Sequence, residues 1–207
     1  MSLIVAGVLG YGLGSVPFGL LLTRAFGAGD LRSIGSGNIG ATNVLRTGRK
    51  GLAAATLLLD AGKGAAAVCI ARLLPHGTFA DGADGATMLA LAGAVGALVG
   101  HCFPMWLKFR GGKGVATMLG VALGLAWPIG VLCLLAWVGM FKLSRISSVG
   151  GMSAGVAAPI AALATGHANM APVLVLLAGL VLFQHRENIA RLRAGTEPRV
   201  GQKKDAA

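Results

Sequence analysis

The 207-residue sequence contains little charge and few cysteines. Charged residues make up 12% of the chain against 55% hydrophobic residues, and hydrophobic runs recur along its whole length. This pattern excludes an ordinary water-soluble domain and predicts an all-α integral membrane protein. The three cysteines are scattered, so they match neither a disulfide framework nor a zinc-binding pattern. We therefore expect no metal site.

Acidic residues are especially few. The chain has 7 Asp and Glu residues against 18 Lys and Arg residues, and the cations lie in short blocks between hydrophobic runs. The positive-inside rule and anionic lipid headgroups account for such blocks, so we expect a membrane partner and no nucleic acid. The 34 glycines would weaken isolated helices in water, but in a membrane they favour close helix packing.

A leader peptide is not expected either. The first hydrophobic run, residues 3–22, has no basic segment before it and no clear cleavage site after it. We interpret it as a retained first span. The basic residues that follow predict a cytoplasmic loop, which places the N-terminus outside.

We predict a polytopic bundle of seven short transmembrane helices, with five possible if the weakest pair does not cross. Residues 114–141 are flanked by cations on both sides, which favours two crossings with a turn near Pro128. The C-terminus is then cytoplasmic. The other expected spans are 3–22, 51–74, 87–100, 149–165 and 171–183. We predict one membrane-embedded domain over residues 1–207, with a flexible basic tail from about residue 199.

Three polar stretches fall on the same predicted membrane face. They are residues 35–43 (GSGNIGATN), residues 101–117 (HCFPMWLKFRGGKGVAT) and residues 185–192 (HRENIARL). In the second stretch, a lysine between glycines precedes a hydrophobic helix, whose unpaired N-terminal amides can receive an anion. Together the stretches supply several cations and almost no acid. They predict a site for a multiply charged anion beside lipid.

Each stretch alone has a simpler explanation. Residues 35–40 match the pattern GxGxxG, but no strand precedes them, so they can serve as a turn and helix cap. The stretch around Lys113 lacks the full P-loop pattern, and the lysine can simply flank the membrane. His185, Asn188 and Arg191 share one side of a helix end, where a lone histidine is more often a headgroup contact.

A buried charge pair is also predicted. Asp60 and Lys63 lie three residues apart inside the second span, so they share one helix face and can partly neutralise each other. The spacing leaves open whether Asp60 orients Lys63 for catalysis or only neutralises it.

The polar stretches resemble the bacterial acyl-phosphate-dependent glycerol-3-phosphate acyltransferase family, often called the PlsY family. The resemblance covers nearly the whole chain. It is carried by residues 35–43, Asp60, Lys63, Gly64, Gly100, His101, Phe103, Pro104, residues 111–117, His185, Asn188, Ile189, Arg191, Leu192, Gly195 and Glu197.

The resemblance implies transfer of a fatty acyl group from acyl phosphate to the 1-hydroxyl of glycerol 3-phosphate. The products are lysophosphatidic acid and phosphate, in phospholipid synthesis at the cytoplasmic face of the bacterial inner membrane. Acyl phosphate is an activated mixed anhydride, so direct transfer requires no acyl-enzyme, metal or cofactor. The protein must supply positioning, phosphate neutralisation and exclusion of water.

On this basis we predict the site residues. The predicted catalytic residues are His185, Asn188, Lys113 and Ser36. The predicted substrate-binding residues are Gly37, Asn38, Thr42, Asn43, Arg46, His101, Gly112, Ser147, Ser148, Arg191 and Glu197. Lys113, Arg46 and Arg191 would neutralise the substrate phosphates. Either His185 or the substrate's own phosphate would accept the proton of the attacking hydroxyl.

Two alternative assignments fit parts of the sequence. His76 and Asp81 fit a His-x4-Asp pattern found in many glycerolipid acyltransferases, but they fall on the opposite predicted face, so we interpret the match as chance. A transporter or channel for a phosphorylated solute or lipid would also need a cationic membrane site. Transporter sites typically lie near the bilayer midplane at a repeat interface, whereas no inverted repeat is visible here.

Overall fold

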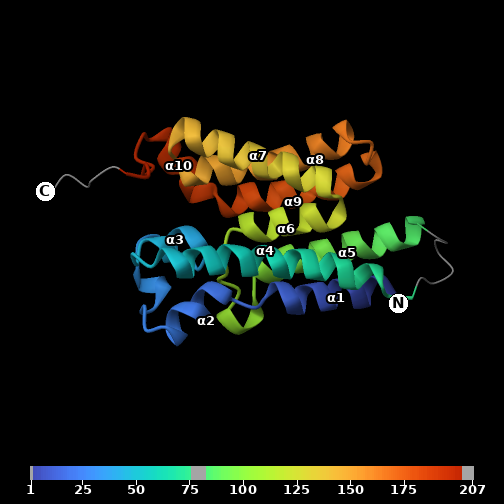
Figure 1. The fold of residues 1–207 in the computed structure, drawn as a ribbon, viewed down its shortest axis with the longest axis horizontal. Helices are drawn as coiled ribbons and strands as arrows, with labels where there is room; N and C mark the ends of the chain where they lie inside the picture. Colours follow the sequence, from blue (N-terminus) through green and yellow to red (C-terminus); the bar gives the residue numbers. More distant parts are fainter. Residues whose placement is uncertain (1, 76–82, 202–207) are drawn as a thin grey trace, which may run out of the picture.

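The structure is a computed structural model that describes residues 2–75 and 83–201. These residues form α-helices and short 3-10 helices, without strands (Figure 1). The α-helices are α1 (Ser2–Gly14), α2 (Phe18–Ala25), α3 (Ala41–Leu45), α4 (Lys50–Arg72), α5 (Ala83–Cys102), α6 (Val115–Leu125), α7 (Trp127–Ser144), α8 (Ser147–Ala164), α9 (Ala171–Gln184) and α10 (Arg186–Arg193). The 3-10 helices are η1 (Leu31–Ser33), η2 (Met105–Leu107) and η3 (Ala168–Met170).

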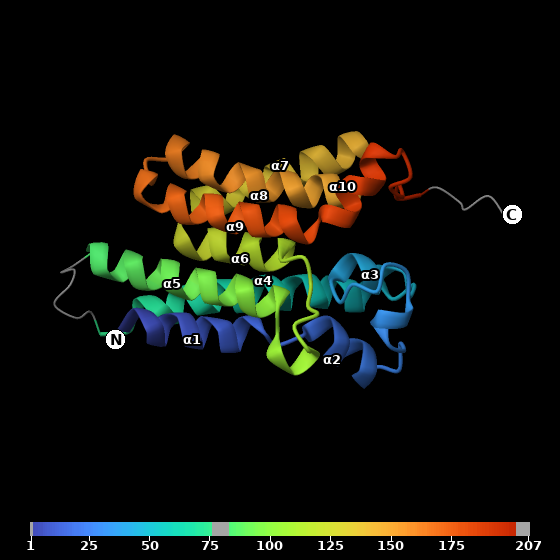
Figure 2. The same cartoon turned by 180° about the vertical axis from the view of Figure 1, so that it is seen from behind.

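The long helices lie side by side in two groups. Helices α1, α4 and α5 form one group, α7, α8 and α9 form the other, and α6 lies between them (Figures 1 and 2). Glycines permit the close contacts within and between the groups. A Cβ at Gly10 would overlap the α5 backbone at Gly93, and a Cβ at Gly120 would overlap the α4 backbone at Ala61. Small residues thus bring helix backbones close together, as the glycine content predicts.

The prediction of a polytopic α-helical membrane protein is confirmed. Five helical segments are long and apolar enough to cross a membrane: Ser2–Ala25, Lys50–Arg72, Asp84–Leu107, Trp127–Ser144 and Ser147–Ala164. Helix α9 with its continuation α10, bent by 61°, provides a sixth candidate, and α6 is a shorter apolar helix of 11 residues. The side of the membrane on which each terminus lies stays a prediction.

The first span is not one continuous helix, as residues 3–22 were expected to be. It breaks between α1 and α2 at Pro17, which has no N–H to continue the helical hydrogen bonds. Lys63 Nζ of α4 donates to the Val16 carbonyl at this break, at 2.7 Å. A buried lysine therefore adds a second hydrogen bond to a carbonyl at the break, which also accepts from the Phe18 N–H at 3.1 Å.

Residues 114–141 do form two helices, as predicted. Helix α6 ends at Leu125 and α7 begins at Trp127, so the chain reverses at Ala126. Pro128 lies in the first turn of α7, where a missing N–H costs no helical hydrogen bond. The turn is therefore two residues earlier than Pro128 and much tighter than a loop.

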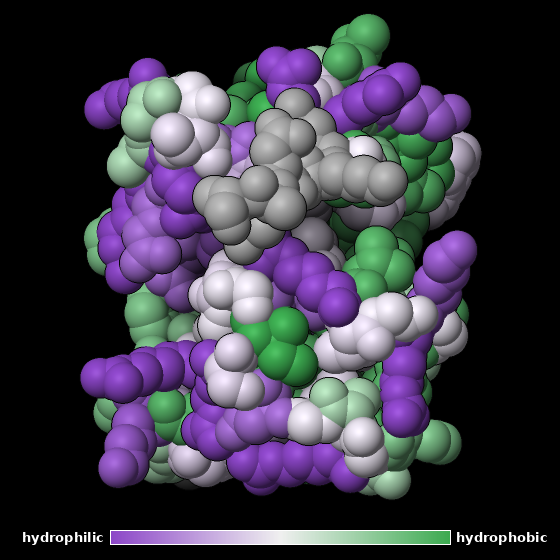
Figure 3. Space-filling model, turned by 90° about the vertical axis from the view of Figure 1, so that its left-hand side faces the viewer, coloured by the Kyte–Doolittle hydropathy of each residue, from purple (hydrophilic) through white to green (hydrophobic). Residues whose placement is uncertain are grey.

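The polar connections meet at one end of the bundle. This end carries α3, α10 and the described C-terminal segment (Figure 1), and Figure 3 shows many hydrophilic residues distributed over it among hydrophobic ones. The connection from α5 to α6, which includes η2, also lies toward this end (Figure 2). His76 and Asp81 lie outside the described residues, so their expected position stays a prediction.

Candidate active site

A cavity of about 710 Å³ lies among the polar connections at this end. The predicted site residues that line it are Ser36, Asn38, Thr42, Asn43, Arg46, His101, Lys113, Ser147, Ser148, His185, Asn188, Arg191 and Glu197. The structure therefore brings together side chains from four separate stretches of sequence. Gly37 and Gly112 were expected to contact substrate but do not line the cavity.

The stretch 35–43 forms a curled loop against the cavity. Gly35 and Gly37 have φ values of +56° and +68°, a region that glycine adopts without strain. Asn43, which is 2% exposed, holds the loop: its Nδ2 donates to the carbonyls of Leu31 and Ile34, both at 2.9 Å. The Asn43 amide is therefore engaged in the loop itself, while the exposed Ser36 presents a hydroxyl at the cavity.

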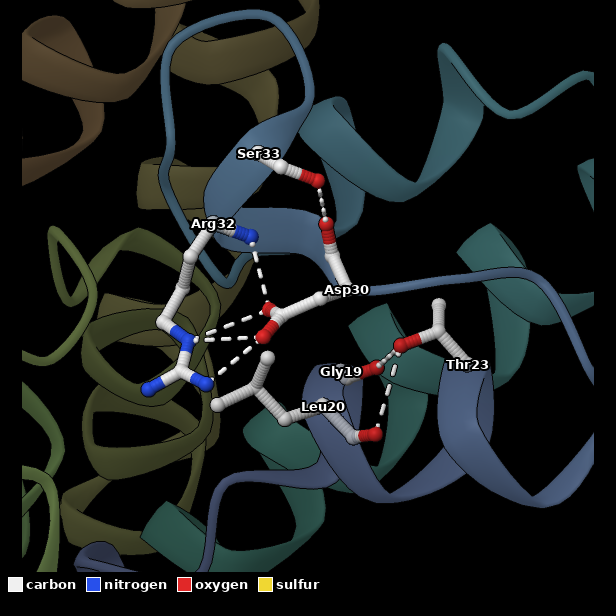
Figure 4. A network of polar contacts seen from close by, with 6 residues as sticks. All are labelled: Gly19, Leu20, Thr23, Asp30, Arg32 and Ser33. Carbon is white, nitrogen blue, oxygen red and sulfur yellow. Dashed lines mark hydrogen bonds and ion pairs between the residues drawn. The ribbon is translucent and has the colours of Figure 1, made fainter.

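A polar network supports the start of this loop (Figure 4). Asp30 caps η1 by accepting from the Arg32 backbone N–H at 3.0 Å, and it pairs with the Arg32 guanidinium at 2.6 Å. The side-chain hydrogen bond from Arg32 lowers the pKa of Asp30 to about 2. Ser33 Oγ also donates to the Asp30 carbonyl, at 2.8 Å. Arg32 is thus used by its own loop and does not line the cavity.

The loop around Lys113, residues 111–114, is called the lysine loop here, and hydrogen bonds to its backbone hold it in place. Gly112 N–H donates to the His101 carbonyl at 3.0 Å, and Gln184 Nε2 of α9 donates to the Gly112 carbonyl at 3.0 Å. A Cβ at Gly112 would overlap the His101 imidazole, so the glycine packs behind the cavity wall. Gly114, with φ +82°, is the N-cap residue directly before α6. The loop thereby presents Lys113 at the cavity.

Lys113 is half-buried and donates from Nζ to Asn188 Oδ1 of α10. Burial lowers the pKa of Lys113, and the nearby Arg191 guanidinium lowers it further. An ammonium in this position gains from a phosphate ligand, because the anion compensates both effects.

Glu197 organises the other side of the cavity. Its carboxylate accepts from Ser148 Oγ at 2.5 Å, Asn188 Nδ2 at 2.5 Å and Arg191 Nε at 2.7 Å. Burial raises the pKa of Glu197, but these three hydrogen bonds and the Arg191 charge outweigh burial, so the pKa is lowered. Arg191 is the arginine that pairs with Glu197.

His185 lies at the bend between α9 and α10 and is 3% exposed. Its Nδ1 lies 2.8 Å from the Val181 carbonyl, which can only accept, so Nδ1 carries the proton. A neutral His185 then has an unprotonated Nε2 that can accept a proton. Thr42 and Ser147 also line the cavity; their side-chain oxygens are 3.0 Å apart and join the stretch 35–43 to α8.

Sequence reasoning missed several cavity residues. Trp137 of α7 and residues 198–200 also line the cavity, and Val200 N–H donates to the Arg145 carbonyl at 2.8 Å. Arg199 and Val200 were assigned to the flexible tail, but here they belong to the cavity wall. Asp60 lines the cavity as well. Its position inside the second span did not indicate that it would reach the site.

The described residues contain no group of three or more His, Cys, Asp or Glu side chains arranged as metal ligands. The cavity chemistry therefore consists of cations, neutral hydrogen-bonding groups and two engaged carboxylates, Asp60 and Glu197. Such a lining suits an anionic ligand.

A profile described as glycerol-3-phosphate acyltransferase matches residues 4–195. The chain belongs to the glycerol-3-phosphate acyltransferase family. Two curated members of the family are similar over nearly their full length. The glycerol-3-phosphate acyltransferase of Ruegeria sp. is 59% identical over 197 residues, 95% of this chain and 93% of that protein. That of Cereibacter sphaeroides is 53% identical over 203 residues, 98% of this chain and 92% of that protein.

Two solved structures of the family have the same fold. They are crystal structures of PlsY, an integral membrane glycerol 3-phosphate acyltransferase, in its glycerol 3-phosphate and lysophosphatidic acid forms. Both have a TM-score of 0.83 and cover 97% of this chain and 96% of PlsY, at 34% and 33% identity. The resemblance drawn from the sequence is therefore confirmed, and the chain is a multi-pass membrane protein of this family.

Proposed function

We propose that the protein transfers a fatty acyl group from acyl phosphate to the 1-hydroxyl of glycerol 3-phosphate. The observation that carries this proposal is the cavity in which Arg46, Lys113 and Arg191 meet. These three cations come from separate segments and surround one space of about 710 Å³. Both substrates carry a phosphate, so a cavity for both needs several cations and few free acids.

The donor assignment follows from the chemistry of the cavity. An acyl phosphate is already activated, because phosphate is a good leaving group. The attacking hydroxyl oxygen forms a bond to the acyl carbonyl carbon, the bond from that carbon to the phosphate oxygen breaks, and phosphate leaves with the electron pair. Lys113 and the N-terminal amides of α6 would stabilise the negative charge that develops.

The remaining lining residues would hold the substrates in place. All six residues named here line the cavity: Ser36, Asn38 and Thr42 would contact the reacting acyl phosphate, and Ser148, His185 and Asn188 would contact the acceptor. Leu57, Val115 and Trp137 line the same cavity, and they would contact the part of the acyl chain next to its carboxyl group.

The attacking hydroxyl must lose a proton. His185 Nε2 is one acceptor for it, because Nδ1 is engaged with the Val181 carbonyl. A phosphate oxygen of the substrate is the other acceptor. Glu197 is held by three donors and therefore serves to position Asn188 and Arg191 rather than to take the proton.

The inner-membrane location with the cavity at the cytoplasmic face is part of the same proposal. The end of the bundle that carries the cavity also carries the basic connections, which the positive-inside rule assigns to the cytoplasm. Labelling of single cysteines introduced into the loops of intact cells would test it.

The decisive assay gives the purified, detergent-solubilised protein glycerol 3-phosphate with either palmitoyl phosphate or palmitoyl-CoA. We expect lysophosphatidate and inorganic phosphate from the acyl phosphate and no product from the CoA ester. Product from palmitoyl-CoA alone would overturn the donor assignment. Folded protein that gives no product with either donor would favour the transporter alternative, and Lys113→Ala with full activity would exclude the lysine as a phosphate ligand.

A further inference from the structure

Three buried polar side chains form a cluster at the cavity wall, and two of them, Asp60 and His101, line the cavity. Asp60 and Lys63 of α4 are 3% and 6% exposed, and His101 of α5 is 4% exposed. Charged side chains within a membrane span are costly and are commonly functional. Lys63 is accounted for by its partners: its Nζ lies 2.6 Å from Asp60 Oδ1 and donates to the Val16 carbonyl at 2.7 Å.

Asp60 has a second polar neighbour. Its Oδ1 lies 3.8 Å from His101 Nδ1, and this nitrogen has no hydrogen-bond partner among the described residues. The separation is too long for a direct hydrogen bond but short enough for electrostatic orientation of the imidazole. A small rotation of either side chain would close the contact.

His101 in turn supports the lysine loop. The Gly112 N–H donates to the His101 carbonyl, and the His101 imidazole packs against Gly112 so closely that no Cβ fits there. The next residue is Lys113, one of the cations that line the cavity. The imidazole thus lies between Asp60 on one side and the lysine loop on the other.

We propose that Asp60 is a positioning residue that acts through His101 to hold Lys113 in place for the reaction. Neutralisation of Lys63 is then only part of its role. The proposal rests on the proposed acyl transfer, because it concerns the placement of the phosphate-binding cation. A carboxylate is needed at residue 60 because its negative charge orients the imidazole across 3.8 Å, whereas the neutral amide oxygen of an asparagine attracts it much more weakly.

A double-mutant cycle between Asp60→Asn and Lys113→Ala tests the proposed connection. We expect Asp60→Asn to lower kcat/KM with palmitoyl phosphate and glycerol 3-phosphate about 10- to 100-fold, because a displaced catalytic group reacts poorly. Since Asp60 acts through Lys113, the double variant should be no worse than Lys113→Ala alone, within about threefold. Losses that multiply in the double variant would overturn the proposal.

A charge-balanced variant separates positioning from neutralisation. Asp60→Asn leaves Lys63 unpaired and can impair folding, whereas Asp60→Asn combined with Lys63→Met removes both charges. We expect this combined variant to be more stable to heat than Asp60→Asn, short of the wild type by the lost Lys63 hydrogen bond to the Val16 carbonyl, and to keep the loss in kcat/KM. Full recovery of activity would show that Asp60 only neutralises Lys63. Asp84→Asn, at the exposed start of α5, is the matched control and should leave both quantities unchanged.

The wild type separates this proposal from the one on which it rests. If the wild type forms no lysophosphatidate from acyl phosphate, the proposed function fails. The double-mutant cycle is then measured as the affinity of each variant for glycerol 3-phosphate, by isothermal titration. Wild-type turnover with multiplicative losses contradicts the role of Asp60 alone. A wild type that neither turns over nor binds glycerol 3-phosphate contradicts both proposals.

Discussion

Replacement of Glu197 by glutamine tests whether one carboxylate organises the cavity. The substitution keeps the size of the side chain but removes its charge and one acceptor oxygen. In the structure, Oε1 accepts from Ser148 and Asn188, while Oε2 accepts from Arg191. A glutamine has only one oxygen for these two positions, so its NH2 group must face donors in either orientation.

The cost follows from the contacts that are lost. If the amide oxygen faces Ser148 and Asn188, the NH2 group opposes the Arg191 guanidinium. If it faces Arg191, the NH2 group opposes Asn188, whose own oxygen is held by Lys113. Either orientation forfeits a charge-assisted hydrogen bond, worth about 1.5–3 kcal/mol. Arg191 is partly exposed, which reduces the value of its pair. We expect a destabilisation of about 2–3 kcal/mol in total.

The assay is thermal unfolding in detergent over a range of pH, with Glu187→Gln as the matched control. Glu187 is exposed on α10, so its substitution should change stability by less than about 0.5 kcal/mol. The folded pKa of Glu197 lies below its ordinary value of 4.5, so its charge stabilises the fold fully above that value. The stabilisation is lost as the pH falls through the lowered folded pKa.

The difference between wild type and Glu197→Gln should therefore be largest near neutral pH and shrink below about pH 4.5. A Glu197→Gln variant as stable as the wild type at pH 7, or a difference that grows toward acid, would refute this account of the carboxylate.

Four further outcomes are expected. Gly64→Ala should destabilise the protein by about 1–3 kcal/mol, because its Cβ would overlap the α6 backbone. Gly62→Ala is the control on the same helix: its Cβ meets open space, so it should be neutral or slightly stabilising in the same unfolding assay. Arg72→Met removes the donor to the last carbonyls of α6 and should cost about 1–3 kcal/mol of stability without changing KM. Gly112→Ala should retain the fold but lower kcat/KM about 10- to 100-fold in the acyltransfer assay, since the loop must shift away from the imidazole. His185→Ala should lower kcat, the turnover rate at saturating substrate, if the imidazole is the base. A retained kcat with a raised KM for glycerol 3-phosphate would show that the substrate phosphate accepts the proton.

Much of the fold could be predicted from the pattern of hydrophobic runs and cations. The lengths of the runs determine helices that can cross a membrane, because backbone groups in lipid must be satisfied within the segment. The cations on both sides of residues 114–141 correctly predicted two helices there. The break at Pro17 was missed, because a proline near a span end is compatible with either a continuous or a broken helix.

Part of the cavity could also be predicted, because an even number of predicted spans separates the polar loops and so puts them at the same end. The stretches around Ser36, Lys113 and His185 were therefore expected to meet, and they line one cavity. The number of spans could not show which polar groups face the cavity and which hold a loop. Asn43 lines the cavity and also holds its own loop, so its predicted contact with substrate stays a prediction, whereas Gly112 packs behind the wall.

Sequence patterns are sufficient to predict a helical membrane protein with a cationic, acid-poor site at one end. Span lengths, clusters of cations and short motifs are local properties of the chain. The contacts of Glu197 with Ser148, Asn188 and Arg191, and the position of Asp60 beside His101, are visible only in the folded structure. These contacts depend on the packing of α4, α5, α8 and α10, which no local pattern specifies.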